Sequence, residues 1–391
     1  MKALQGIRVF DMTRILAGPF CTQILGDLGA EVIKIEQPHV GDVTRSWGPP
    51  FENDSKESAY FLSCNRNKRS LSLDFTKPEG LEIAYALIQK SDVLVENFKT
   101  GFLARHGLGY DDVRKIKPEI IYCSITGFGQ TGPYAERPGY DFQIQGLSGL
   151  MSLIGEPEGA PMRAGISVAD IGTGIYSALG ILAALYQRTR TGEGQYIDMA
   201  LLDSTLALMS FAAQSYVLNG ELPPRVGNGH PNIVPYGAFQ AKDGLVIVAI
   251  GSESQFKNFC HAVGRKDLLA HPHYLNNEVR VLHREEVLTE MNKIIGSQAK
   301  AYWLEKLEKV GVPTGLVNTL DETFEDPQVK ARKIVQCFQE GLKTIASPLH
   351  LSASSADYKR RPPHLGEHTI EILSEILSGE EIEVLKEKGT V

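Results

Sequence analysis

The sequence predicts an α/β fold, with a Rossmann-like large domain and a smaller α+β domain, from two observations. Strand-like apolar runs alternate with helical runs through the first half of the chain, which is typical of βαβ units around a mainly parallel sheet. The chain is 391 residues long, which is long enough for two domains. We expect the large domain to span residues 1–225, the small domain 226–330, and residues 331–391 to return to the large domain.

The expected strands of the first half are short apolar runs bounded by polar or glycine residues. They cover residues 7–12, 31–36, 71–75, 92–98 and 119–125. Pro78 follows Thr76 at a position typical of a helix start, so a helix is expected over residues 80–90.

The middle of the chain carries two long apolar segments, residues 171–187 and 199–219, joined by a basic turn at 188–194. Both are interrupted by small polar residues and fall short of the roughly 20 apolar residues of a membrane span, so we expect buried core helices.

The sequence of the second half of the chain predicts the small domain and then a return of the chain to the large domain. A hairpin is expected with its turn at Asp243-Gly244, followed by three helices, then a strand near the tail and an amphipathic helix. These elements cover residues 237–240 and 245–250, then 253–263, 284–296 and 300–309, and finally 349–351 and 369–377.

Composition narrows the class of protein. The formal net charge is −7, so we do not expect the basic surface that a nucleic-acid-binding protein presents. The five cysteines are odd in number and lack Cys-x-x-Cys spacing, so reduced thiols in the cytoplasm are expected. The first residues run directly into a predicted strand, and we expect neither a targeting segment nor a membrane partner.

Three common site motifs are missing. The turn after the first strand, residues 13–19, lacks Gly-x-Gly-x-x-Gly, and no P-loop sequence occurs. The histidines, for instance His271 and His273, show neither His-Glu-x-x-His nor clustering with carboxylates, so we expect no metal site.

Polar loops follow several predicted strands, at the edge where open α/β sheets bind ligands. They are residues 13–19, 96–101 and 127–133. The basic segment 65–70 (NRNKRS) and Arg105 could hold phosphate groups, since guanidinium groups bind phosphate in a bidentate fork. Alternatively, segment 65–70 is a solvated surface loop.

Asp170 stands immediately before a long apolar helix, among glycines. A carboxylate there is a good helix N-cap. It could equally be a nucleophile, kept ionised by the helix dipole and open to a bulky acyl group. The pattern alone leaves both roles open.

A series of motifs, in one order along the chain, resembles the class III coenzyme A transferase (CaiB/BaiF) family, which includes formyl-CoA transferase and carnitine CoA-transferase. The motifs are LAGPFCTQILGDLGAEVIKIE (16–36), GDVTRSW (41–47), NRNKRSLSLD (65–74), DVLVENF (92–98), YCSITGFGQTGP (122–133), PGYD (138–141), VADIGTG (168–174), QRTRTGEGQYIDMALLDS (187–204), HPNIVPYGAF (230–239) and HLGEHT (364–369). Within the family the sequence is most similar to the succinyl-CoA:dicarboxylate branch, such as the glutarate enzymes.

The resemblance implies a set of site residues. Asp170 matches the acyl-accepting aspartate, and Tyr140 with Asp141 matches an active-site tyrosine–acid pair. Leu16 replaces a glutamine of formyl-CoA transferase, while Gly229 and His230 stand in place of its glycine-rich flap, as residues of the acyl pocket. Contacts to CoA are implied for Arg14, Ala17, Gln37, Leu73, Asn97, Phe98 and Arg105, of which Gln37 replaces an arginine.

The resemblance also implies the chemistry. CoA would pass from an acyl-CoA donor, succinyl-CoA, to a dicarboxylic acid through covalent intermediates on Asp170. The CoA thioester is then a substrate, no cofactor is permanently bound, and two chains interlock as rings in a homodimer. An ordinary aspartate has a pKa of about 3.9, so we expect Asp170 to be ionised at neutral pH without an activating base.

Two other functions compete with this one. An α-methylacyl-CoA racemase shares the fold but uses a histidine in a Gly-His-Asp context, whereas this chain has Gly139-Tyr140-Asp141. A tyrosine of pKa about 10 is a poor base near neutral pH. A noncatalytic acyl-CoA-binding protein would keep the CoA contacts and have no need of Asp170.

Overall fold

A computed structural model describes residues 1–339 and 341–391, and these form two compact units. Unit 1 comprises Met1–Ser148, Ala164–Ser210 and Arg332–Val391. Unit 2 comprises Gly149–Arg163 and Phe211–Ala331. The chain therefore leaves unit 1 twice, once for the short segment that begins at Gly149 and once at Phe211, whereas the sequence suggested a single departure near residue 225.

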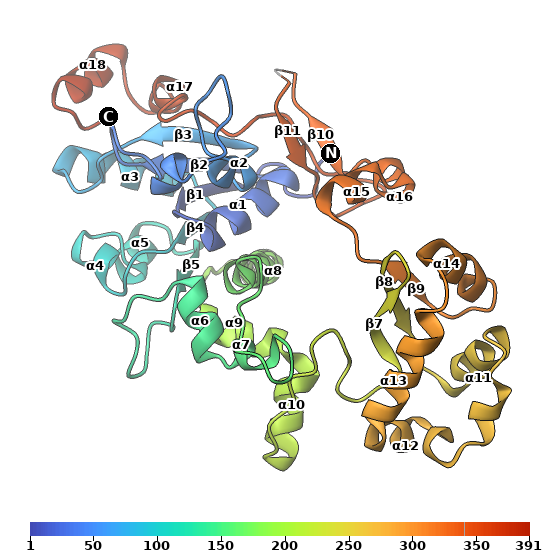
Figure 1. Cartoon of the computed structure of the whole chain (residues 1–391). Helices are drawn as coiled ribbons and strands as arrows, with labels where there is room; N and C mark the ends of the chain where they lie inside the picture. Colours follow the sequence, from blue (N-terminus) through green and yellow to red (C-terminus); the bar gives the residue numbers. More distant parts are fainter. Residues whose placement is uncertain (340) are drawn as a thin grey trace. The chain divides into compact units, whose positions relative to one another are not determined.

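Unit 1 is built on a six-stranded sheet in which every neighbouring pair is parallel (Figure 1). Its order is β3-β2-β1-β4-β5-β6. The strands are β1 (Arg8–Met12), β2 (Glu31–Glu36), β3 (Lys68–Ser72), β4 (Val93–Glu96), β5 (Ile121–Thr126) and β6 (Gln195–Ala200). The order reverses direction between β1 and β4, and an open α/β sheet binds its ligands in the crevice at such a point.

The sequence missed β6 and misplaced β3. Strand β6 covers residues 195–198, for which no element was predicted, and the first two residues of the helical segment predicted over 199–219. It lies at the sheet edge with most of its side chains only partly buried. An edge strand of mixed polar and apolar residues gives a weak apolar signal. Strand β3 begins at Lys68, three residues before the predicted start at Leu71, because basic side chains are buried there.

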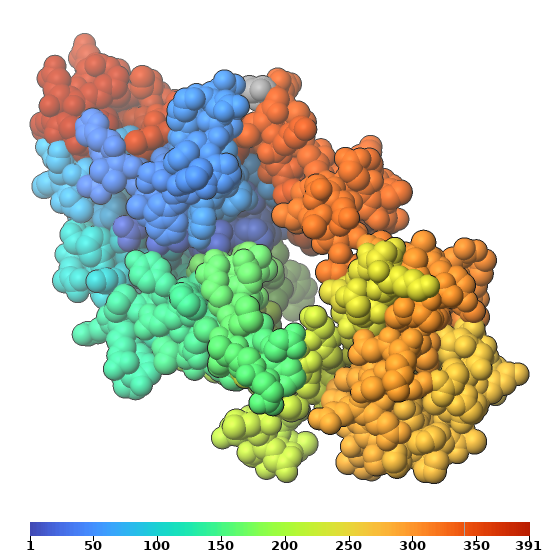
Figure 2. Space-filling view, in the orientation of Figure 1, coloured from blue at the N-terminus to red at the C-terminus, as the bar shows by residue number. Residues whose placement is uncertain are grey.

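Alternate residues of the central strands face two separate cores, as the period of a strand requires. Val9, Val95 and Ile121 face the core formed with α1 (Ala17–Asp27), α8 (Val168–Thr191) and α9 (Leu201–Leu208). Phe10 and Leu94 face the core formed with α3 (Pro78–Gln89), α5 (Tyr110–Ile116), α17 (Thr369–Leu373) and α18 (Gly379–Glu387). The C-terminal helices therefore lie against α3 of the first half of the chain (Figure 2).

Helix α8 is the longest helix of unit 1 and carries Asp170 near its start. Its glycines permit close packing: a Cβ on Gly174 would lie 2.7 Å from the Ala17 carbonyl oxygen, and one on Gly172 would lie 2.3 Å from Leu208. Helix α8 is also the one described helix long and apolar enough to cross a membrane by length and composition, yet half of that stretch is buried within the protein. The glycines near Asp170 thus serve helix packing.

The remaining elements of unit 1 are short. They are η1 (Val43–Ser46), α2 (Ala59–Ser63), α4 (Phe102–Arg105), α6 (Asp141–Leu147) and an antiparallel pair, β10 (Val335–Cys337) with β11 (Lys343–Ile345). The strand predicted at residues 349–351 is wrong, since Leu349 and Leu351 are exposed and unpaired with any described strand. The predicted helix 369–377 ends at Leu373.

Unit 2 contains a three-stranded antiparallel sheet, β7 (Tyr236–Ala241), β8 (Gly244–Ala249) and β9 (Thr314–Leu316). Helices α11 (Glu253–Ala262), α13 (Arg284–Ile295) and α14 (Lys300–Glu308) pack on it through Phe259, Met291 and Trp303. The hairpin and these three helices were predicted from the sequence, and β9 was not. Shorter elements of the region are α7 (Leu150–Leu153), α10 (Ser210–Asn219), η2 (Lys266–Ala270), η3 (Pro272–Tyr274), α12 (Asn277–Leu282), α15 (Leu320–Glu325) and α16 (Pro327–Ala331).

Candidate active site

Two cavities open in unit 1 where the carboxyl ends of β1 and β4 meet. The larger has a volume of about 440 Å³ and the smaller about 170 Å³. Both are lined by four of the same residues, Arg14, Ile15, Phe98 and Tyr140. The two cavities therefore share a wall, and a single extended ligand could occupy both.

The shared wall is held by reciprocal hydrogen bonds between the loops that follow β1 and β4. The Arg14 amide donates to Asn97 Oδ1 at 2.8 Å, and Asn97 Nδ2 donates to the Arg14 carbonyl oxygen at 2.6 Å. The Arg14 guanidinium lies 4.4 Å from the centre of the Phe98 ring, which stacks on Phe102 at 5.1 Å. An exposed cation thus stands beside an aromatic wall.

The residues implied for CoA binding lie together, with one exception. Arg14, Gln37, Leu73 and Phe98 line the larger cavity. Arg14, Ala17, Asn97 and Phe98 line the smaller one. Arg105 lines neither and is exposed at the end of α4. The contacts of all seven with CoA stay predictions.

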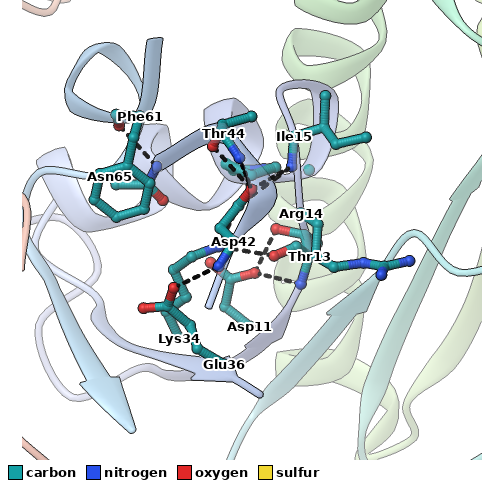
Figure 3. Close-up of polar contacts among 12 residues, drawn as sticks. Asp11, Thr13, Arg14, Ile15, Lys34, Glu36, Asp42, Thr44, Phe61 and Asn65 are labelled. Carbon is teal, nitrogen blue, oxygen red and sulfur yellow. Dashed lines mark hydrogen bonds and ion pairs between the residues drawn. The ribbon is translucent and has the colours of Figure 1, made fainter. Parts of the chain in front are cut away.

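A buried ion pair between Lys34 and Asp42 stabilises the loop that follows β1 (Figure 3). Lys34 Nζ lies 3.0 Å from Asp42 Oδ2 and donates to the Thr13 carbonyl oxygen at 2.8 Å. Asp42 in turn accepts from the Ile15 amide at 3.2 Å. Ile15 has a φ of +71°, which is a rare conformation for a β-branched residue. The pair therefore holds the cavity loop in a strained conformation.

The charges of this pair are mutually compensated. Burial opposes the ionised form of Asp42, but the Lys34 ammonium and the Thr44 amide outweigh it and lower the pKa of the carboxyl. Burial likewise opposes the charge of Lys34, and Asp42, Asp11 and Glu36 outweigh it and raise its pKa. Both groups are accordingly charged at neutral pH.

The side chains of the basic segment 65–70 belong to the same network of buried ion pairs. Lys68 is fully buried 3.1 Å from Asp11, Arg66 pairs with Asp27 at 2.5 Å, and Arg69 contacts Glu371 at 2.9 Å. The prediction that this segment binds phosphate is wrong, and so is the solvated alternative. Its positive charges are paired with carboxylates of β1, α1 and α17.

Asp170 is the third residue of α8, and Ser167 occupies the N-cap position, so the N-cap role for Asp170 is wrong. The helix start is capped from outside by Asp141, whose Oδ1 accepts from the Ala169 amide at 2.8 Å and the Asp170 amide at 3.3 Å. Gln145 Nε2 donates to the other oxygen of Asp141 at 2.7 Å. Because Asp141 does the capping, the Asp170 carboxylate is left free to face the smaller cavity, which it lines.

The carboxyl of Asp170 is desolvated although the residue is partly exposed. Burial of the carboxyl, and after it the negative charge of Asp141, raises the pKa of Asp170 to about 7. Among the described residues, no basic side chain forms an ion pair with it. The prediction that Asp170 is ionised at neutral pH like an ordinary aspartate is therefore wrong, because protonated and ionised forms coexist there.

Tyr60 is a neighbour of Asp170 that sequence reasoning missed. Burial, and after it the charge of Asp170, raises the pKa of Tyr60 to about 12, opposed by a hydrogen bond with Ser167. Its ring meets Trp47 edge-on at 5.2 Å. Tyr60 lies on α2, far from Asp170 in sequence, and no motif or spacing marks it.

Tyr140 and Leu16 line the smaller cavity together with Asp170. Tyr140 precedes α6 and is exposed, whereas Leu16 is buried before α1. No histidine lines this cavity within the described residues. The histidine that a racemase would use together with the aspartate is accordingly not part of the described wall of this cavity.

Gly229 and His230 belong to unit 2. His230 stacks on Phe211 at 5.4 Å, and its Nδ1 accepts from the Asn232 amide at 3.0 Å. Burial, and then the charge of Arg284, lowers the pKa of His230. The imidazole is therefore neutral near pH 7, and its hydrogen lies on Nε2 because Nδ1 acts as acceptor. The acyl-pocket role of both residues stays a prediction.

Comparisons with known proteins bear on this geometry. The family described as CoA-transferase family III matches residues 4–369. A succinate–glutarate CoA-transferase of Agrobacterium fabrum is 44% identical over 381 residues, covering 95% of each chain. A human succinyl-CoA:glutarate CoA-transferase is 42% identical, covering 96% of this chain and 86% of that one. A crystal structure of a CaiB/BaiF family protein from Brucella suis is 43% identical, with a TM-score of 0.86, covering 96% of this chain and 99% of that one.

Proposed function

The chain belongs to CoA-transferase family III, and from that premise we propose that it moves CoA from succinyl-CoA to a dicarboxylic acid through covalent intermediates on Asp170. The family resemblance predicted from the sequence is confirmed, and the protein is an enzyme that transfers CoA. The observation that carries the covalent step is the Asp170 carboxyl, which lines a cavity and forms no ion pair with a basic side chain in the described part of the chain.

The choice of substrates rests on the relatives. The names of the Agrobacterium and human enzymes give succinate, succinyl-CoA and glutarate, and both are more than 40% identical to this chain over nearly all of it. Succinate and glutarate are dicarboxylic acids, so we assign a dicarboxylate acceptor and a succinyl-CoA donor to this chain. CoA thioesters are then its substrates, and no resident cofactor is required.

The first half of the proposed reaction transfers CoA to the protein. An Asp170 carboxylate oxygen attacks the thioester carbonyl of succinyl-CoA, the carbon–sulfur bond breaks, and CoA thiolate leaves a mixed anhydride on Asp170. The thiolate then attacks the aspartyl carbonyl, succinate departs, and Asp170 carries CoA as a thioester. Such splitting of one difficult step into easier ones is the purpose of a covalent nucleophile.

The second half reverses the order with the acceptor. The acceptor carboxylate attacks the aspartyl thioester and expels CoA thiolate, and the thiolate then attacks the acceptor's carbonyl in the new anhydride, which regenerates Asp170. Each tetrahedral oxyanion needs hydrogen-bond donors. The Ala169 and Asp170 amides are already bonded to Asp141, and the Gly227 and Gly229 amides, which the sequence offered as candidates, are bonded to the carbonyl oxygens of Gly155 and Val226, so we assign this task to other donors.

We propose that CoA lies along the shared wall of the two cavities. The aromatic side chains of Phe98, Phe102 and Phe75 line the larger cavity beside Arg14, a combination suited to a flat base and a phosphate. The smaller cavity holds Asp170, so the thioester end would enter there. Exposed Arg105 would reach phosphate outside both cavities.

We propose that two copies form an interlocked homodimer, as the family resemblance implies. Helix α8 supports a partner, since its exposed face carries Ile175, Leu179 and Tyr186, which are 51%, 59% and 61% exposed. A helix that is apolar on all sides is normally buried. Sedimentation at nanomolar concentration is expected to show a stable dimer, and a monomer of 42.9 kDa would contradict it.

We also propose a reducing, cytoplasmic location. All five cysteines are free thiols, and four of them are buried. Unpaired cysteines in a chain of this size are typical of a cytosolic protein.

The experiment for the proposed function is a panel of carboxylic acids offered with succinyl-CoA, with new acyl-CoA products identified by mass. We expect glutarate or another dicarboxylate to be converted and monocarboxylates to be poor acceptors. Enzyme-dependent exchange of the α-hydrogen of a 2-methylacyl-CoA in D₂O, without transfer, would instead support the racemase.

A further inference from the structure

Unit 2 contains a cluster of histidines around a single carboxylate. His271 and His273 flank Pro272 at the short helix η3, and Glu286 lies in the first turn of α13. We propose that His271, His273 and Glu286 form a binding site for a divalent transition-metal ion of the zinc type. The proposal concerns a site apart from the transferase chemistry and does not depend on it.

The potential ligand atoms are already close to one another. One ligand atom from each of the three residues lies within 4.8 Å of the others. His273 Nδ1 is 2.6 Å from Glu286 Oε2, and the rings of His271 and His273 are 5.3 Å apart at a steep angle of 76°. Zinc–nitrogen and zinc–oxygen bonds are about 2.0–2.2 Å, so ligand atoms around one ion stand about 3–4 Å apart. Small side-chain rotations would bring these atoms to that spacing.

The chemistry of the ligand set selects the class of metal. Two imidazoles and one carboxylate are the protein ligands of many zinc sites that keep a position open to water. Imidazole nitrogen suits zinc, copper and nickel, whereas calcium and magnesium require oxygen ligands. The cluster is open to solvent, so an ion can enter directly, and water can complete the coordination.

A third histidine, His283, packs against the cluster. The ring of His283 stacks on that of His273 at 3.6 Å and 9°. The hydrogen bond from His273 and the charges of His273, His271 and His283 together lower the pKa of Glu286. The ring of His283 therefore packs against that of His273, which is the histidine paired with Glu286.

The prediction of no metal site relied on the lack of a carboxylate close to the histidines along the chain. The fold supplies Glu286 from a helix thirteen residues beyond His273. A simple surface hydrogen bond between His273 and Glu286 is the alternative, and it differs in one respect. It requires neither His271 nor a metal.

The test is a titration of the full-length protein with zinc chloride at pH 7.5, in competition with a chromogenic zinc indicator. We expect one ion per chain, and binding at least about ten-fold weaker in His273→Gln and in His271→Gln, since each removes one of three ligands. His350→Gln and Cys337→Ser are the matched controls, because each removes an exposed ligand type elsewhere in the chain, and both should bind like the wild type.

Cobalt(II) in place of zinc gives a second readout, because its visible absorption reports coordination by nitrogen and oxygen atoms of the protein. We expect a new band in the wild type that is lost in His271→Gln, a change that a simple His273–Glu286 pair would not produce. Equal zinc affinity and equal cobalt spectra in the wild type and His271→Gln, or failure of the wild type to compete for micromolar zinc, would overturn the proposal.

Discussion

Two aspartates of unit 1 line the neighbouring cavities and have opposite electrostatic surroundings. Asp42, at the larger cavity, lies 3.0 Å from the Lys34 ammonium and accepts from two backbone amides, and its pKa is lowered. Asp170, at the smaller cavity, has a second carboxylate nearby, and its pKa is raised to about 7. Both carboxyls are desolvated, so the difference lies in the partners.

The difference separates a structural carboxylate from a reactive one. Every oxygen of Asp42 is engaged, so the group can hold the Ile15 loop but has no free electron pair to offer an acyl group. Asp170 is spared such engagement because Asp141 caps α8 in its place. A desolvated carboxylate without partners is costly for the fold and reactive toward a thioester.

The largest expected effect is on activity when the reactive group is changed. Asp170→Asn removes the oxygen nucleophile, so kcat should fall by up to about 10⁶, as for other covalent nucleophiles. Steady-state transfer from succinyl-CoA measures this. Asp203→Asn, an exposed aspartate in the first turn of α9, is the matched control and should retain full activity. A folded Asp170→Asn protein with more than a few per cent of activity would contradict the assignment.

Breaking the structural pair should affect stability instead. Lys34→Met leaves Asp42 buried without its cation, which typically costs about 3–5 kcal/mol. Denaturant titration should show this loss as a lower midpoint with an unchanged slope. The double variant Lys34→Met/Asp42→Asn should recover much of the loss, because no uncompensated charge remains. An additive double variant would mean that the two charges do not interact.

The two aspartates should also give stability opposite dependences on pH. The folded pKa of Asp170 is raised above its unfolded value, so its contribution to stability is lost as pH rises from about 4 to about 7. The pKa of Asp42 is lowered, so its contribution persists at high pH and is lost only as pH falls below about 4. Asp170→Asn should therefore be at least as stable as the wild type at pH 8. A clear loss of stability there would contradict the raised pKa.

The pH profile of the reaction is the next test. Only ionised Asp170 can attack, so kcat/KM for succinyl-CoA should rise to a plateau with an apparent pKa near 7. At pH 6 it should be about ten-fold below the plateau, since the ionised fraction falls ten-fold per pH unit below the pKa. A flat profile down to pH 5 would show that the carboxyl titrates like an ordinary aspartate.

The smallest expected effect is at exposed Arg105. Loss of one charge-assisted phosphate contact typically costs about 1.5–3 kcal/mol, so Arg105→Ala should raise KM for CoA esters about ten-fold or more with little change in kcat. Lys115→Ala, an exposed basic residue on nearby α5, serves as the control. An unchanged KM in a folded Arg105→Ala protein would remove this residue from the CoA site.

The sequence was sufficient for those features whose signal is local. Apolar periodicity located β1, β2, β4 and β5 and placed β3 three residues too late, because buried parallel strands are continuous apolar runs and β3 begins with basic residues. It failed at β6, an edge strand, and at Lys34 and Lys68, which are buried only because Asp42 and Asp11 arrive from other segments. Charged residues are expected at the surface unless a partner is known, and the partner is a property of the fold.

The residues of the candidate active site also fall into those that had a sequence signal and those that had none. Motifs placed Asp170, Tyr140 and Asn97 in one region, and the structure brings them to the same cavity wall. The capping of α8 by Asp141 and the proximity of Tyr60 had no sequence signal, because both are contacts between distant segments. The raised pKa of Asp170 follows from the burial of its carboxyl and then from the charge of Asp141, and neither could be predicted without the fold.

The central claim is that Asp170 carries the acyl group and then CoA, and trapping the intermediate tests it most directly. The enzyme is mixed with succinyl-CoA and hydroxylamine, quenched, digested and analysed by peptide mass spectrometry. We predict a hydroxamate on Asp170 that requires succinyl-CoA and is missing from Asp170→Asn, with Asp141 and Asp42 unmodified. A hydroxamate on Asp141, or none on any residue while transfer proceeds, would contradict the account.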